Sequence, residues 1–136
     1  MTEFFYVVPV AGIVALIFAF VLSSRIEKAD AGNDRMKEIA SYIQEGAMAF
    51  LTREYRSLAI FVIVLFLVLT FLIGWQTAVC FLVGGLFSAA TGYFGMKVAT
   101  KANVRTANGA RQGMNKALGI AFSGGAVMGM SVVGFG

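Results

Sequence analysis

The chain has 136 residues, of which 59% are hydrophobic, and a mean hydropathy of +0.82. Soluble globular domains are roughly 45–50% apolar, so this composition excludes an ordinary soluble fold. There are 11 Lys and Arg, 7 Asp and Glu, one Cys and no His. A single cysteine excludes an intrachain disulfide, and without histidine a Cys/His metal site within the chain is excluded as well.

Four stretches contain no charged residue, at 4–24, 58–74, 77–96 and 117–136. Each holds about 17–21 residues, and a helix needs roughly 20 to cross the hydrocarbon core of a bilayer. The sequence therefore predicts an all-α, polytopic protein with four transmembrane helices, integral to the membrane (the cell or inner membrane if the source is prokaryotic).

Every Lys and Arg lies in one of two windows, 25–56 and 97–116, that separate these stretches. Basic residues collect in the cytoplasmic connections of membrane proteins. The pattern thus predicts an N-terminus outside and cytoplasmic connections at 25–57 and 97–116. It also accounts for the net charge of +4, which we do not interpret as a sign of nucleic-acid binding.

The first stretch does not resemble a signal peptide, because its start is acidic, its apolar run is long, and Arg25 and Lys28 follow it. Residues 24–33 are predicted to form a polar loop, after which Asn33 or Asp34 can cap a new helix. No proline interrupts 34–74, and about 40 residues at ~1.5 Å each span ~60 Å, twice the ~30 Å hydrocarbon core. We expect the first half to stand in the cytoplasm, with Gly46 as the position for a bend.

Trp75 is expected to anchor the next, external turn at the membrane interface. The third and fourth stretches then carry small residues at helical spacing, which allow helix backbones to approach closely in lipid. A pore lining is the alternative, but ion paths usually contain charged residues at mid-membrane depth, so helix packing is favoured. The predicted packing residues are Gly84, Ser88, Gly92, Gly95, Ala117, Ala121, Gly125 and Gly129.

Basic residues between these two stretches form the predicted cytoplasmic basic anchor: Lys97, Lys101, Arg105, Arg111 and Lys116. The first three are four residues apart on an extension of the third helix, which Gly109 and Gly113 are expected to break. The anchor could attract a polyanion such as a phosphate compound. Membrane topology and attraction to anionic lipid, worth ~1 kcal/mol per basic residue, are the favoured explanation, and no P-loop motif is present.

Three carboxylates, Glu38, Glu45 and Glu54, could ligate a metal or relay protons. They lie close to Lys37, Arg53 and Arg56 in sequence, so solvated ion pairs are favoured. No catalytic, metal-binding or substrate-binding residue is therefore predicted in this chain.

Three segments together resemble the membrane-integral pyrophosphatases, an ion-pumping family. Glu45-Gly-Ala-Met-Ala-Phe-Leu-Thr-Arg-Glu-Tyr-Arg56 is similar to the family's E-G-A-x-A-F-L-x-R-x-Y-[KR] segment. Gly95-Met-Lys-Val-Ala-Thr-Lys-Ala-Asn-Val-Arg-Thr106 is similar to its G-M-K-x-A-T-x-A-N-x-R-T stretch, and Gly124-Gly-Ala-Val-Met-Gly129 to its [SG]-G-[AS]-V-M-G helix. Their order and spacing agree, and the resemblance covers nearly the whole chain.

The resemblance implies a homodimer whose subunits have about sixteen helices of membrane-spanning length, hydrolysing pyrophosphate at a cytoplasmic Mg²⁺ site and driving H⁺ or Na⁺ outward. Activation by K⁺ is a further possibility that it raises. In the family, an inner ring of helices, beginning with the fifth, holds substrate and metals. Its acidic D-x-x-A-D-x-x-G-K-x-E signature is absent here, so no catalytic residue is carried over.

The chain is therefore expected to be the N-terminal fragment of such a pump, inactive by itself, with its helices in the outer ring as a scaffold for the remaining helices of the same protein. Two alternatives stay open. One is a self-contained four-helix transporter that dimerises through Gly125 and Gly129, although small drug/proton antiporters need a mid-membrane carboxylate that this chain lacks. The other is a non-catalytic membrane assembly subunit.

Overall fold

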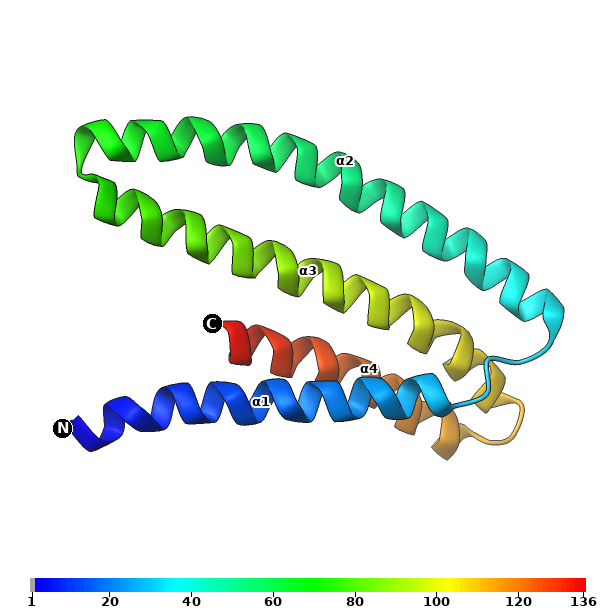
Figure 1. Cartoon of the computed structure of the whole chain (residues 1–136). Helices are drawn as coiled ribbons and strands as arrows, with labels where there is room; N and C mark the ends of the chain where they lie inside the picture. The colour runs from blue at the N-terminus through cyan, green and yellow to red at the C-terminus, as the bar shows by residue number, and fades with distance from the viewer. Residues whose placement is uncertain (1) are drawn as a thin grey trace.

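The computed structural model describes residues 2–136, which form four helices and no strand (Figure 1). All four are long and apolar enough to cross a membrane. The predicted all-α, four-span architecture is confirmed, while its orientation in the membrane stays a prediction. The helices are α1 (Thr2–Lys28), α2 (Asp34–Leu72), α3 (Trp75–Ala110) and α4 (Met114–Phe135).

Two of the helices are much longer than a bilayer requires. α2 has 39 residues and α3 has 36, so at ~1.5 Å per residue they reach ~60 Å and ~54 Å. Figure 1 shows α2 as a continuous arc, and Gly46 does not interrupt it. The prediction of one long uninterrupted helix is confirmed, while the placement of its first half outside the hydrocarbon core stays a prediction.

The first connection is shorter than the predicted loop. α1 continues through Lys28, so only residues 29–33 connect it to α2. Residues 24–28 are all compatible with a helical conformation. The positive charges of Arg25 and Lys28 also interact favourably with the negative end of the helix dipole. Gly32 adopts a φ of 92° that favours glycine. As predicted, Asn33 caps the next helix, with its Oδ1 accepting a hydrogen bond from the Met36 amide at 2.9 Å.

Glycine also forms the other two turns. Gly74, between α2 and α3, has a φ of 151°, and Gly113, between α3 and α4, has a φ of 153°; both values favour a residue without a Cβ. The predicted break at Gly109 is wrong, because this buried residue lies within α3. The chain turns only at 111–113, where the Gly113 amide still bonds to the Gly109 carbonyl at 3.1 Å.

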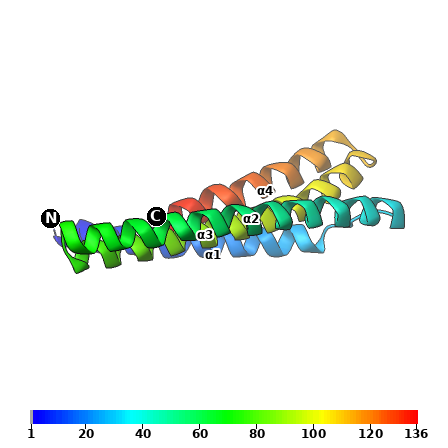
Figure 2. The same cartoon turned by 90° about the horizontal axis from the view of Figure 1, so that it is seen from above.

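The helices pack in the spatial order α2, α3, α4, α1 (Figures 1 and 2). α3 and α4 each contact two neighbours along their length, whereas α1 meets α3 over a shorter region. The start of α1 lies at the same end as the α2–α3 turn, and the loops at 29–33 and 111–113 lie at the other end (Figure 1). α4 runs back from that loop end and stops short of the α2–α3 turn (Figure 1). The main core joins α1, α3 and α4 through Ala19, Ile26, Val98, Ala102 and Val127.

Candidate functional site

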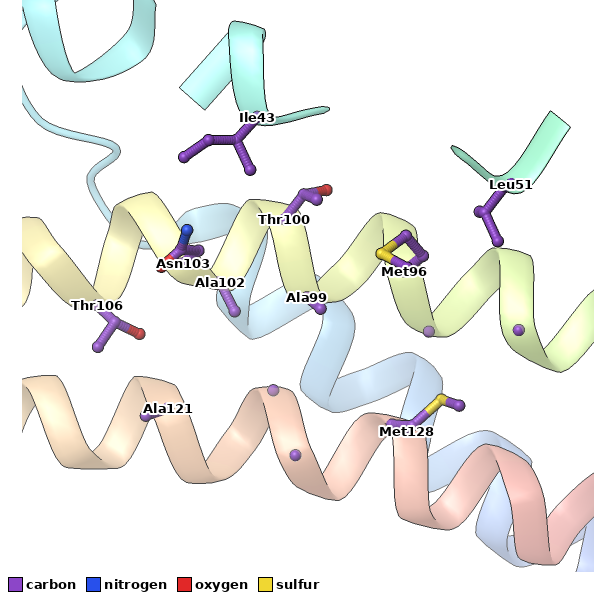
Figure 3. A pocket seen from close by; sticks show the side chains of 14 residues that line it. Ile43, Leu51, Met96, Ala99, Thr100, Ala102, Asn103, Thr106, Ala121 and Met128 are labelled. Carbon is purple, nitrogen blue, oxygen red and sulfur yellow. The ribbon is translucent and has the colours of Figure 1, made fainter. Parts of the chain in front are cut away.

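A groove runs along α3, and α2 and α4 form its two walls (Figure 3). It encloses about 770 Å³. Ile43 and Leu51 point toward it from α2, and Thr106 points from α3 toward α4 (Figure 3). The other lining residues are Gly92, Gly95, Met96, Ala99, Thr100, Ala102 and Asn103 of α3, with Ala121, Gly124, Gly125 and Met128 of α4.

Small side chains make this groove hollow. Ala99 and Ala102 end at Cβ, and a Cβ placed on Gly125 would meet no atom of the chain within 4 Å. Its few polar groups are neutral, and one of them is satisfied locally, since Thr100 Oγ1 donates to the Lys97 carbonyl at 2.9 Å. The groove therefore offers a mainly apolar surface on which a helix backbone could approach closely.

The lining carries no group for acid–base or metal chemistry. None of its 14 residues is an Asp, Glu, Lys, Arg or Cys. Across residues 2–136, no cluster of three or more His, Cys, Asp or Glu could hold a metal ion. Such a surface can bind another apolar surface, but it cannot itself activate water or transfer a proton.

Six of the eight predicted packing residues line two hollows. Gly92, Gly95, Ala121 and Gly125 line the groove. Gly84 and Ser88 line a second hollow of about 470 Å³ between α3 and α4. Ala117 lies against Gly109, with its Cα 3.5 Å from the position of a Cβ there. A Cβ on Gly129 would have no neighbour within 4 Å in the chain.

Gly92 and Gly95 also make contacts within the chain. The Tyr55 hydroxyl of α2 donates to the Ala89 carbonyl of α3 and would lie 2.8 Å from a Cβ on Gly92. A Cβ on Gly95 would overlap the sulfur of Met128. The hydrogen bond of Tyr55 thus links α2, which forms one wall of the groove, to α3. Helical spacing alone did not reveal this role.

Two further close approaches between helices involve glycines that the spacing analysis missed. A Cβ on Gly12 of α1 would lie 3.1 Å from the Gly134 carbonyl oxygen of α4. A Cβ on Gly124 would lie 3.0 Å from the Ala102 Cβ of α3. Gly12 is followed at helical spacing by Ala15 and Ala19, both buried, and this small-residue pattern on α1 is the signal that could have marked it.

Two residues of the predicted basic anchor bind the end of α1 and the residue that follows it. Lys101 forms an ion pair with Glu27 at the end of α1. Arg105 donates to three backbone carbonyls, those of Ala29 at 3.1 Å, Lys101 at 3.0 Å and Glu27 at 3.5 Å. Asn108 adds a bond from its Nδ2 to the Asp30 carbonyl at 3.2 Å. We call Glu27, Lys101, Arg105 and Asn108 the α1–α3 clamp.

The clamp perturbs one carboxyl group, which lies beyond the apolar stretch 4–24. The hydrogen bond from Lys101 lowers the pKa of Glu27 below its ordinary value, and the positive charges of Lys101, Arg105 and Lys97 act in the same direction. The carboxylate form is thereby favoured. Sequence spacing could not reveal this pairing, because the partners are 74 residues apart.

In the part of the chain that the structure describes, the other three residues of the predicted basic anchor make no bond to α1, and their interaction partners lie in α2, α3 and the α3–α4 turn. Lys97 Nζ lies 6.0 Å from the centre of the Tyr93 ring, Arg111 Nη1 lies 3.9 Å from Met36 Sδ, and Lys116 donates to Gln112. In the first half of α2, which we call the α2 extension, Glu38 forms an ion pair with Arg35 at 3.2 Å and accepts a hydrogen bond from the Tyr42 hydroxyl at 2.8 Å. Among residues 2–136, the predicted ion pairs of Glu45 and Glu54 are not formed.

Comparison with known proteins identifies the family of this chain. The family model described as inorganic H⁺ pyrophosphatase matches residues 13–136. The chain belongs to this family. It is accordingly an integral, multi-pass membrane protein, in agreement with its four apolar helices.

Comparison with individual proteins leads to the same family. The chain is 60% identical to a putative K⁺-stimulated pyrophosphate-energized sodium pump of Clostridium tetani, an alignment that covers 96% of the chain and 19% of that protein. It is 46% identical to a K⁺-insensitive pyrophosphate-energized proton pump of Methanosarcina mazei, over 98% of the chain and 20% of the relative. A K⁺-stimulated sodium pump of Thermotoga maritima is 44% identical, over 96% of the chain and 18% of that protein. The chain thus spans about a fifth of the length of these relatives.

Proposed function

We propose that this chain is the N-terminal membrane segment of a pump that couples pyrophosphate hydrolysis to outward transport of H⁺ or Na⁺. The family match over residues 13–136 supports the activity. Both sodium and proton pumps occur among the relatives, so the proposal covers either ion. The share of about a fifth of each relative supports the view that the chain acts as part of a larger protein.

The four helices act in this proposal as a scaffold and not as the hydrolytic site. The observation that carries this role is the groove, which is large, floored by small residues, and lined by no ionisable side chain. Apolar helices of the same protein are the occupants that such a surface suits. Gly84, Ser88, Gly92, Gly95, Ala121, Gly125 and Gly129 would then face or flank these helices, and Ala117 would pack at the α3–α4 turn.

The proposed orientation places the connections 25–57 and 97–116 in the cytoplasm, with spans at 4–24, 58–74, 77–96 and 117–136. The loop ends of α1 and α4 and the extensions of α2 and α3 would therefore lie on the cytoplasmic side. Lys97, Lys101, Arg105, Arg111 and Lys116 would mark that side, as basic residues do in short loops. Within this set, Lys101 and Arg105 hold α1 in place.

Mg²⁺ is the proposed metal of the complete pump, where it would neutralise the phosphates and assist attack by water. Acidic residues outside these 136 are proposed to hold it, as the family resemblance implies. Two relatives are named as K⁺-stimulated, which supports K⁺ as an activator. A homodimer of the complete protein is proposed from the family resemblance.

The proposal is tested by measuring pyrophosphate hydrolysis in membranes. We expect the 136-residue chain to have no activity, and the longer gene product that contains it to be active only with Mg²⁺. Expressing the chain and the remaining polypeptide as two pieces should restore activity only when both are present. Hydrolysis by the 136-residue chain alone, or full activity of the remainder without it, would refute the scaffold role.

A further inference from the structure

A smaller pocket is lined by residues of the last turn of α1 and the first turns of α4. Both segments lie toward the loop end of the molecule (Figure 1). It encloses about 320 Å³ and has a polar and an apolar part. Arg25 and Lys116 supply two positive charges, and Asn115 adds an amide. Ile26, Gly119 and Ile120 line it with apolar surface.

The pocket is at the edge of the apolar region. Arg25 directly follows the charge-free stretch 4–24, and Lys116 directly precedes the stretch 117–136. α1 runs toward the loop end and α4 runs away from it (Figure 1), so both residues mark the same membrane boundary. A pocket at this depth faces lipid headgroups on one side and the upper part of the acyl chains on the other.

The positive charge of this pocket is not neutralised by the chain. Among residues 2–136, the ion pairs are Arg35–Glu38 and Lys101–Glu27, and neither involves Arg25 or Lys116. The start of α4 adds to the positive potential, because Gly113 provides no side-chain cap for the first amides of the helix. Lys101 and Arg105, by contrast, are engaged in the α1–α3 clamp.

We propose that this pocket binds the phosphate of an anionic phospholipid. Arg25 and Lys116 would hold the phosphate oxygens, and the partly exposed Ile120 would contact the start of an acyl chain. A free inorganic phosphate would gain nothing from the apolar wall, which is why we assign the site to a lipid. This assignment depends on membrane insertion alone and is independent of pump activity.

Native mass spectrometry of the purified chain in detergent, titrated with phosphatidylglycerol or phosphatidylcholine, tests the site. The double variant Arg25→Gln/Lys116→Gln should bind phosphatidylglycerol about 25-fold more weakly, since each basic residue near an anionic headgroup contributes about fivefold. The matched control Arg35→Gln/Lys37→Gln loses the same charge on the α2 extension and should bind like the original chain. Arg25→Lys/Lys116→Arg should retain binding.

A second variant tests the pocket with its charges intact. A Cβ on Gly119 would meet no atom within 4 Å, so Gly119→Leu should fold normally, fill the pocket and weaken phosphatidylglycerol binding. Equal losses in both charge variants, unchanged binding in Gly119→Leu, or equal binding of phosphatidylcholine would overturn the proposal. Displacement of the lipid by millimolar inorganic phosphate would assign the site to a free anion and overturn it too.

Discussion

The two sides of α4 differ in how completely this chain covers them. Toward α1, the helix backbones are close together at Gly12 and Gly134, and Val127 and Ser131 are fully buried. Toward α2, α4 is separated from the opposite wall by the 770 Å³ groove. We refer to these as the closed side and the open side.

This difference separates what the chain can stabilise by itself from what needs another surface. On the closed side, small residues already contact a neighbouring backbone, and in lipid such packing is a main source of helix association. On the open side, the same type of residue borders unfilled space, as at Gly125. A small-residue stripe thus has different consequences depending on whether its partner helix is present.

The largest effect is expected on the closed side, from Gly12→Leu. The added side chain would meet the Gly134 carbonyl, which is backbone and cannot rotate away, and overpacking of this kind costs about 3 kcal/mol. Reversible unfolding in mixed micelles should show this loss. Gly46→Leu adds the same side chain at a position where a Cβ would meet no atom within 4 Å and serves as the control. Equal stability of the two variants would show that the helices are not closely packed there.

The clamp should contribute somewhat less. Arg105→Ala removes donors to the Ala29 and Glu27 carbonyls, and hydrogen bonds from a charged group are worth about 2 kcal/mol. Limited proteolysis of the 29–33 loop should become faster in this variant. Lys97→Ala removes one positive charge of α3 without breaking a bond to α1, so it should cleave like the original chain. If the two variants behave alike, the loop is held by something other than the clamp.

A smaller effect is expected at the wall of the open side, from Tyr55→Phe. The variant loses one hydrogen bond to the Ala89 carbonyl and keeps the ring, which should cost about 1 kcal/mol in a membrane setting. Tyr42→Phe is the control, because the Tyr42 hydroxyl bonds only within α2, to Glu38. Unfolding midpoints in mixed micelles would compare them, and a larger loss for Tyr42→Phe would contradict the α2–α3 contact.

The smallest effect concerns acid. The pKa of Glu27 is lowered in the folded chain, so its pair with Lys101 stabilises the fold above the ordinary pKa and is lost as pH falls through the folded value. Stability should therefore decrease slightly more between about pH 5 and pH 3 than in Glu27→Gln, which has no such carboxyl. Parallel pH profiles for the two proteins would show that the pair contributes nothing.

Much of the fold followed from the pattern of charges. The four charge-free stretches predicted four helices, and the absence of proline between Asp34 and Gly74 predicted the length of α2. Boundaries were less accurate, since α1 continues to Lys28 and α3 continues through Gly109. Local residue types do not determine where a helix ends when the neighbouring residues also allow a further turn of helix.

The site was less predictable. Helical spacing identified Gly92 and Gly95 but not Gly12, whose importance depends on a backbone more than a hundred residues away. The basic anchor was identified as a group, yet the partners of Lys101 and Arg105 lie across the α1–α3 contact. Interactions between distant segments leave no local period in a sequence.

The central claim is that the open side receives further helices of the same protein. The most direct measurement compares Gly125→Leu with Gly119→Leu, two α4 variants at positions where a Cβ would meet no atom of this chain within 4 Å, by co-purifying the chain with the remaining polypeptide and assaying pyrophosphate hydrolysis. We predict that Gly125→Leu lowers both by about tenfold or more, equivalent to ~1.4 kcal/mol of lost packing, while Gly119→Leu lowers neither. Full association and activity of Gly125→Leu would contradict the claim.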